Sequence, residues 1–218
     1  MFWYLLLAHL LGDYPFQPYW LVVNKRHAWA LLLHGAIHFM FMFAVAGNVR
    51  LQILPQLIVL TIAHIIIDAT KTTASTKRSL STQSSYLIDQ AIHLILIALT
   101  AFWIERSLPA DLSPQAWGWA VILTGYVFVT YGWATTERLL TENSSQYNEE
   151  VISQLWPRMI TRAALFTLGL FLLQSQTSVA VLAAVNLPYL SGQYRRRALL
   201  TDLAVTVGTT ITVLLALG

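Results

Sequence analysis

The chain has 218 residues, of which 56% are hydrophobic and only 11% are charged, and its formal net charge is +3. A soluble domain has about 25% charged residues, so this chain cannot cover a water-facing surface and is expected in a lipid bilayer. It has no basic face with interleaved aromatic residues outside its apolar segments, which excludes a nucleic-acid reader. Cysteine is absent, which excludes a disulfide framework and a thiolate metal site.

Apolar runs predict the fold class, an all-α, polytopic transmembrane bundle of about seven to eight membrane segments in one domain over residues 1–218. The first run, residues 2–12, is too short to cross about 30 Å of hydrocarbon at about 1.5 Å per residue. We therefore predict a half-span or a re-entrant helix there. The runs at 162–174 and 177–190 are either two short spans or one broken span. The other segments are expected at residues 28–46, 54–70, 86–104, 115–136 and 199–217.

The distribution of cations predicts the orientation. Loops 13–27, 71–85, 137–161 and 191–198 hold most of the Lys and Arg, including Arg158, whereas the opposite loops hold only Arg50 and Arg106. The positive-inside rule makes the first set of loops cytoplasmic. With eight segments we therefore expect a multi-pass protein of a bacterial inner (cytoplasmic) membrane with both termini in the periplasm. If residues 162–190 form one span, the C-terminal end lies on the opposite side and the first four segments keep their orientation. Glu137 and Arg138 are interpreted as an ion pair at the membrane interface.

Four apolar segments within residues 1–104 each carry one pair of metal-ligand-type residues spaced four apart. Positions i and i+4 lie on one face of an α-helix, so each segment directs both side chains the same way. In the expected orientation all the pairs lie at a similar depth, toward the cytoplasmic leaflet. This predicts one shared site, whereas the pattern assigns no role to residues 115–218. The pairs are His9 and Asp13, His34 and His38, His64 and Asp68, and Asp89 and His93.

Metal binding is the chemistry that this pattern favours. A charge inside a bilayer costs several kcal/mol, and a divalent cation satisfies carboxylates and neutral imidazoles together. Mixed His and Asp ligands suit zinc best, with iron or manganese as the other choices. The candidates exceed one tetrahedral zinc, so either one or two ions share the site, and some residues support ligands or act as general bases. A metal-free proton relay through Asp–His contacts is the alternative.

Roles follow from position. Lys25 and Lys71 are expected at the cytoplasmic mouth, where they attract an anionic group such as a phosphate. Lys71 is equally well interpreted as an ordinary orientation signal. Asp89 and His93 are assigned a catalytic role. Metal ligation is assigned to His9, Asp13, His34, His38, His64 and Asp68, and contact with the substrate or with the ligands to Gln17, Lys25, Lys71 and Gln90.

The segments HLLGDYPFQPYWLVVNK, LLLHGAIH, HIIIDATK and IDQAIHL, in this order and spacing, resemble a bacterial integral-membrane family described as domain of unknown function 3307. The resemblance covers about residues 5–98. It implies that the twelve residues assigned above are signature positions, and it implies no established activity. More loosely, the HxxxH and HxxxD pairs are similar to those of membrane-embedded metal-dependent hydrolases of the ceramidase and adiponectin-receptor group. The serine-containing motif of that group is not evident in this chain.

The leading functional hypothesis is a metal-dependent hydrolase that acts on a lipid or another membrane-accessible substrate. The alternative is a transporter of a metal ion or a proton-coupled solute that uses the same His and Asp residues. A transporter predicts polar residues that continue to the far side of the membrane, and the outer halves of these helices contain few. A redox metalloprotein is a third hypothesis, disfavoured because histidine is scarcer than in membrane di-iron oxygenases.

Overall fold

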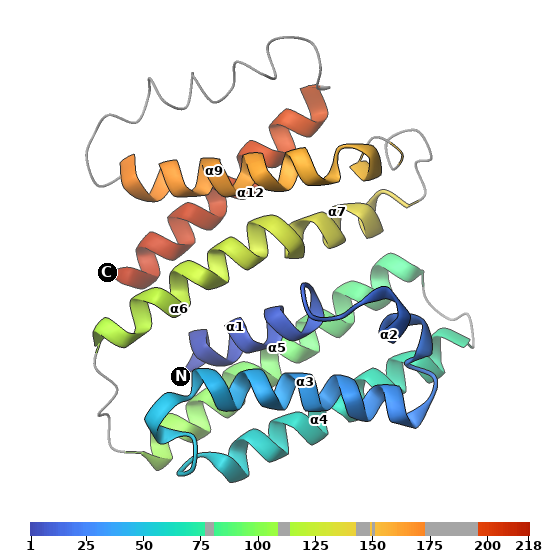
Figure 1. The fold of residues 1–218 in the computed structure, drawn as a ribbon, viewed down its shortest axis with the longest axis vertical. Coiled ribbons are helices and arrows are strands. Elements are labelled where there is room, and N and C mark those ends of the chain that lie inside the picture. Colours follow the sequence, from blue (N-terminus) through green and yellow to red (C-terminus); the bar gives the residue numbers. More distant parts are fainter. Residues whose placement is uncertain (77–80, 109–113, 143–148, 150, 173–195) are drawn as a thin grey trace. The chain divides into compact units, whose positions relative to one another are not determined.

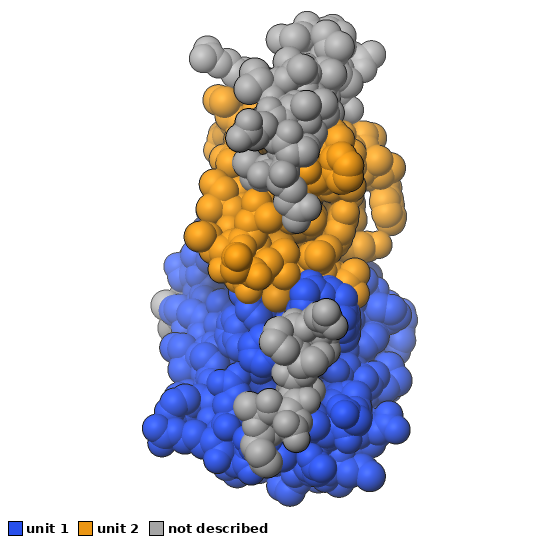
Figure 2. All heavy atoms as spheres, turned by 90° about the vertical axis from the view of Figure 1, so that its left-hand side faces the viewer, with its two compact units in different colours: residues 1–120 blue, residues 121–218 orange. Residues whose placement is uncertain are grey.

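A computed structural model describes residues 1–76, 81–108, 114–142, 149, 151–172 and 196–218. Within these residues all regular structure is helical, which confirms the all-α prediction (Figure 1). The chain divides into two compact units, residues 1–120 and 121–218, which Figure 2 colours separately. The expectation of a single domain stays a prediction.

Among the described residues, four helices are long and apolar enough to cross a membrane: Ala28–Val45, Leu54–Thr73, Thr82–Ser107 and Arg197–Leu217. Each corresponds to a predicted segment, with boundaries that differ by a few residues at one or both ends. The total of seven to eight membrane segments stays a prediction, and the run at 177–190 lies outside the described residues. The predicted segment 115–136 consists of α6 (Pro114–Val127), the π-helix η2 (Phe128–Gly132) and the first turn of α7 (Trp133–Leu140).

Unit 1 contains a closed ring of four helices, α1 (Phe2–Asp13), α3 (Ala28–Val45), α4 (Leu54–Thr76) and α5 (Thr82–Ser107). α1 packs on α3 and α5, α3 packs on α4, and α4 packs on α5 (Figure 1). α1 has 12 residues, or about 18 Å of helix, and residues 4–10 are all buried. The predicted short first segment is therefore a helix enclosed by its own unit.

Local sequence signals explain where these helices begin. Pro18 precedes the short helix α2 (Tyr19–Asn24), and Pro55 lies in the first turn of α4, where its missing N–H costs no hydrogen bond. Ser81 caps α5, because its hydroxyl accepts a 3.1 Å hydrogen bond from the backbone N–H of Ser84. α2 packs on α3. The polar segment between α1 and α3 is thereby held against the ring.

Two glycines let the helices of unit 1 approach closely. A Cβ added at Gly12 would lie 2.6 Å from the imidazole of His38 on α3. A Cβ added at Gly35 would collide with the side chain of Ile65 on α4. The absence of side chains at these positions sets the spacing of α1 to α3 and of α3 to α4. His38 can therefore lie directly against α1.

Unit 2 is organised around buried charges. Arg158 on α9 (Leu155–Leu172) donates to both carboxylate oxygens of Asp202 on α12 (Arg196–Leu217), at 2.7 and 2.9 Å, and to Glu137 of α7 at 2.9 Å. Arg162, one turn later, also donates to Asp202, at 2.8 Å. Both arginine side chains are 1% exposed. The prediction that Arg158 lies in a cytoplasmic loop is therefore wrong, because its side chain is buried on a helix. The predicted ion pair of Glu137 with Arg138 is also wrong: Glu137 pairs with Arg158, and Arg138 is exposed.

In unit 2, a side chain of another helix binds a backbone carbonyl group of the π-helix. Nε of Arg162 donates a 2.6 Å hydrogen bond to the backbone carbonyl of Val129, inside η2. A π-bulge widens the helix by one residue and turns carbonyls away from their usual donors. Arg162 therefore joins α9 to α12 through Asp202 and to η2 through the backbone.

We predict that Gly12→Ala destabilises the protein. The new methyl group has to displace the His38 ring, and overpacking of this kind costs about 1–3 kcal/mol. Gly208→Ala is the control, because a Cβ there meets nothing within 4 Å and alanine favours a helix. Thermal unfolding in detergent measures both variants. Equal midpoints for the two variants would contradict the close approach of α1 and α3.

We predict a larger effect for Asp202→Asn. The substitution leaves two buried guanidinium groups with one carboxylate, and breaking a buried charge pair costs about 3–5 kcal/mol. Glu142→Gln removes an exposed carboxylate from the same unit and should change the free energy of unfolding by less than about 0.5 kcal/mol. Unfolding by a titration with sodium dodecyl sulfate measures both variants. The role assigned to Asp202 is wrong if Asp202→Asn unfolds at the wild-type midpoint.

Candidate metal centre

The structure brings the predicted pairs together inside the ring of unit 1. α1, α3, α4 and α5 contribute one pair each, and the spacing of four residues puts both members of a pair on the inner face. All the side chains are buried except that of Asp13, which is 10% exposed. Neighbouring imidazole rings have centroids 3.8–5.6 Å apart. The convergence is therefore a property of the fold, while ligation of a metal stays a prediction.

The first donor group consists of Asp13, His34, His38 and His64, whose ligand atoms all lie within 4.8 Å of one another. Oδ1 of Asp13 is 3.1 Å from Nε2 of His38 and 3.2 Å from Nε2 of His34. Nε2 of His34 is 3.1 Å from Nε2 of His64. Ligands about 2.1 Å from a tetrahedral zinc lie about 3.4 Å apart, so small shifts would place a cation among these atoms.

The second donor group consists of His64, Asp68 and His93, and it shares His64 with the first. Nε2 of His64 is 3.8 Å from Oδ2 of Asp68, and Nε2 of His93 is 3.9 Å from Oδ1 of Asp68. These separations are longer than those in the first group. The first group is therefore the better prepared site.

The hydrogen bonds of His93 define its tautomer. Nδ1 of His93 lies 2.9 Å from the backbone carbonyl of Asp89, and a carbonyl oxygen only accepts, so Nδ1 carries the proton. Nε2 then carries a lone pair in the neutral ring, as metal-binding and proton-accepting imidazoles require. This nitrogen is buried and has no hydrogen-bond partner in the part of the chain that the structure describes.

His9 lies beside both donor groups without belonging to either. Its ring stacks on that of His93, with centroids 5.1 Å apart, and its Nε2 is 3.4 Å from Oδ2 of Asp13. Within the described residues this nitrogen also makes no hydrogen bond. His9 is thus placed to orient Asp13 and to face a small ligand between the rings.

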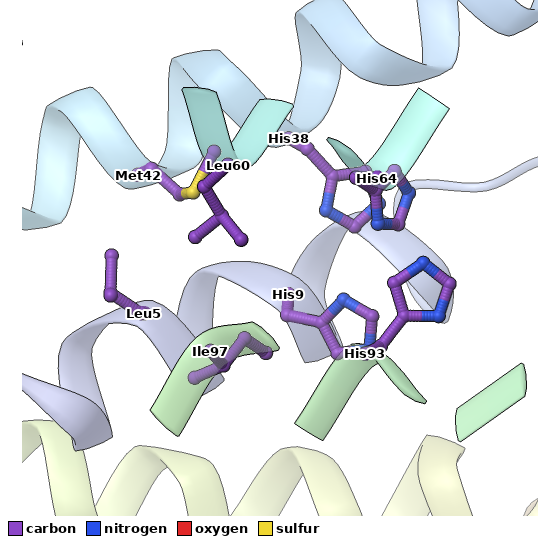
Figure 3. Close-up of a pocket in the computed structure, with 8 residues that line it drawn as sticks. All are labelled: Leu5, His9, His38, Met42, Leu60, His64, His93 and Ile97. Carbon is purple, nitrogen blue, oxygen red and sulfur yellow. The ribbon is translucent and has the colours of Figure 1, made fainter. Parts of the chain in front are cut away.

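A small cavity adjoins these imidazoles (Figure 3). The centre of a water-sized sphere can move within ≈ 10 Å³ of this cavity. The cavity is therefore about large enough for one water molecule. In Figure 3 the rings of His9, His38, His64 and His93 face one part of this space. The remaining wall is apolar and consists of Leu5, Met42, Leu60 and Ile97.

The polar end of the cluster contains both predicted lysines. Nζ of Lys25 lies 2.5 Å from Oδ2 of Asp68, and Nζ of Lys71 lies 2.6 Å from Oδ2 of Asp89. Their side chains are 17% and 35% exposed, whereas those of the carboxylates are 5% exposed. The lysines therefore connect the buried cluster with its surroundings.

The predicted glutamines contact the cluster as well. In the orientation that satisfies its hydrogen bonds, the amide of Gln17 accepts from Lys25 at 2.5 Å and donates to the backbone carbonyl of Asp13 at 3.0 Å. Nε2 of Gln90 lies 3.4 Å from Oδ2 of Asp13. Both glutamines thus position Asp13 or its neighbours.

Two tyrosines at this end were not singled out from the sequence. Tyr14 and Tyr86 share a 2.8 Å hydrogen bond between their hydroxyl groups, and the hydroxyl of Tyr14 donates to Gln90 at 3.4 Å. A chain of polar groups therefore leads from the tyrosines through Gln90 to Asp13. The available signal was adjacency: Tyr14 follows Asp13, and Tyr86 precedes Asp89 by three residues.

Comparison with known proteins gives a family and no activity. The family model described as "Protein of unknown function (DUF3307)" matches residues 1–118, and this range includes all four helices of the cluster. No curated protein and no solved structure matches the chain. The matches therefore do not support the looser likeness to membrane metal-dependent hydrolases. The expected membership is confirmed: this chain belongs to the DUF3307 family of proteins of unknown function.

Proposed function

We propose that unit 1 is a membrane-embedded hydrolase that depends on a divalent metal ion, most simply zinc. The observation that carries the proposal is the first donor group, in which three imidazole nitrogens and one carboxylate lie at separations close to those of zinc ligands. Iron and manganese accept the same ligand types. Histidine and carboxylate are the ligand types of catalytic zinc sites, which use three protein ligands and leave the fourth position to water, so three of these four residues would hold the ion while water binds.

The chemistry follows from the neighbours of this group. A divalent ion held among Asp13, His34, His38 and His64 would supply activation of water near neutral pH and polarisation of the carbonyl or phosphoryl oxygen of a substrate. His93 accepts a proton from the water at Nε2, since its Nδ1–H is held by the carbonyl of Asp89. The water oxygen would bond to the acyl or phosphoryl centre while the bond from that centre to the leaving group breaks, and Nε2 of His93 would pass the proton that it accepted to the leaving group. The backbone carbonyl of Asp89 keeps His93 oriented, and the catalytic roles assigned to both residues stay part of the proposal.

The partial exposure of Lys25 and Lys71 supports access to the cluster from one end, which suits an enzyme. Substrate reaches the cluster past Lys25 and Lys71, which attract an anionic or strongly polar group. On the other side of the imidazoles, the cavity wall is apolar. We place the lysine end at the inner leaflet of a bacterial inner membrane, where an ester or phosphoester of a lipid is available. Transport through the cluster would require a polar route on both sides.

One observation favours transport as the second candidate. Gln56 on α4 and Thr100 on α5 are buried polar residues. Along each helix, the apolar residue of the cavity wall, Leu60 or Ile97, lies between this polar residue and the histidine of the cluster. Oε1 of Gln56 has no hydrogen-bond partner among the residues described. A cation that moved past Leu60 and Ile97 would meet these groups next.

The first prediction of this proposal concerns metal content. Protein purified in detergent and loaded with zinc should retain metal after gel filtration, and His38→Ala should weaken binding at least about 100-fold because a ligand is lost. His27→Gln is the matched control, since His27 is exposed and belongs to neither donor group. Elemental analysis measures the bound zinc. A wild-type protein that retains no more metal than His38→Ala would rule out the centre.

A second prediction separates hydrolysis from transport. Zinc-loaded protein should hydrolyse p-nitrophenyl esters or phosphoesters, and His93→Gln should lower kcat about 10²–10⁴-fold while zinc is retained, since only the proton acceptor is removed. His27→Gln should keep the wild-type rate. Zinc flux measured in proteoliposomes tests the alternative. Flux that requires His93, without hydrolysis of any ester in the series, would favour the transporter.

A further inference from the structure

We infer that the centre binds one divalent cation together with one anion, and that Lys25 holds Asp68 in place of a second cation. The inference rests on the proposed metal centre and decides between the one-ion and two-ion alternatives. It also specifies the class of ligand that accompanies the metal.

The carboxylates differ in their cationic partners. Asp68 is paired with Lys25 at 2.5 Å, and Asp89 is paired with Lys71 at 2.6 Å. Asp13 has no lysine or arginine partner within the described residues, and its oxygens face His34, His38 and Gln90. Of the three carboxylates, Asp13 is therefore the one whose negative charge is not neutralised by a lysine or arginine of the described residues. It belongs to the first donor group and not to the second.

Lys25 competes with a cation at the second donor group. Its ammonium lies against Oδ2 of Asp68, whereas His64 and His93 approach this carboxylate only to 3.8 and 3.9 Å. A divalent ion held by His64, Asp68 and His93 would share Asp68 with the ammonium, and like charges within a few Å repel strongly in a low-dielectric interior. The second group can therefore fill only when Lys25 leaves Asp68.

The total charge gives the same answer. Asp13, Asp68 and Asp89 carry three negative charges against the two ammonium groups of Lys25 and Lys71, so the cluster has one negative charge with neutral imidazoles. One divalent cation changes this to one positive charge, and two change it to three. Uncompensated charge is costly away from water. One divalent cation and one anion make the cluster neutral.

The anion has a place in the structure. The cavity that has imidazoles on one side and an apolar wall on the other is about the size of one water molecule. In turnover this position would be taken by an anionic oxygen of the reacting group, such as that of a phosphoric ester. Azide, an anion of three atoms that can bind a metal through one terminal nitrogen, serves as a probe.

The stoichiometry of metal binding tests the inference. Full-length protein in detergent is freed of metal with a chelator, loaded with excess zinc, passed through a gel-filtration column and analysed for zinc per chain. Wild type should retain one zinc. Lys25→Met should retain two, because Asp68 is released, and the cluster charge of −2 with two divalent cations is then balanced by two anions instead of one. Arg26→Met, which removes the exposed neighbouring cation, should retain one. Asp68→Asn in the Lys25→Met background should return the value to one.

Each outcome has a separate meaning. Two zinc ions in wild type would overturn the inference and leave the proposed centre intact, and this measurement does not depend on any variant. One zinc in both wild type and folded Lys25→Met would overturn the role of Lys25. If wild type retained no zinc after gel filtration, the proposed function itself would be wrong.

The anion is tested with cobalt-loaded wild type titrated with azide. The visible spectrum should change with a stoichiometry of one azide per cobalt, because the cation and its protein ligands leave one positive charge to be neutralised. Cobalt-loaded Lys25→Met should bind more azide per protein chain than cobalt-loaded wild type does. An unchanged spectrum in a large excess of azide would overturn the part of the inference that concerns the anion.

Discussion

Compensation of buried charge is the constraint on which this structure depends. Unit 1 places carboxylates and imidazoles between apolar helices, where an unpaired ion costs several kcal/mol. Lysines that enter from the polar end neutralise Asp68 and Asp89, and hydrogen bonds from histidines and Gln90 reach Asp13. The result is a cluster that is nearly balanced and still has imidazole lone pairs directed into its interior. Such a partly satisfied polar cluster suits a ligand-binding role better than a purely structural one.

Unit 2 also neutralises its buried charges, but it does so with arginine–carboxylate ion pairs. Arg158 and Arg162 meet Glu137 and Asp202 as two positive and two negative charges, and the fork of each guanidinium spans helices that the sequence separates widely. The pairing is direct and short, with donor–acceptor distances of 2.7–2.9 Å. Permanent charges of this kind fix the arrangement of α7, α9 and α12. The titratable imidazoles of unit 1 are instead suited to proton transfer and metal binding.

Close packing decides the geometry of the cluster. α1 is too short to serve as an ordinary membrane span, but its burial carries His9 and Asp13 into the interior of the ring. Gly12 lets the ring of His38 lie against α1, and Gly35 lets α3 approach α4. Separations near 3.1 Å between ligand atoms of different helices require helix axes this close. The cluster is thus as sensitive to small residues at the helix contacts as to the ligand residues themselves.

The sequence by itself determined the helical class, four of the membrane-length helices and the eight inward-facing residues, because helix period and hydrophobicity are local properties. It also indicated Lys25, Lys71, Gln17 and Gln90 through their positions at the polar ends. Only the tertiary structure decided which lysine meets which carboxylate, that His93 directs a free Nε2 inward, and that Tyr14 contacts Tyr86. It alone turned Arg158 from an apparent loop cation into the buried partner of Asp202. These pairings join residues 18 to 72 positions apart, and they depend on the rotation and spacing of packed helices, which no spacing within one helix encodes.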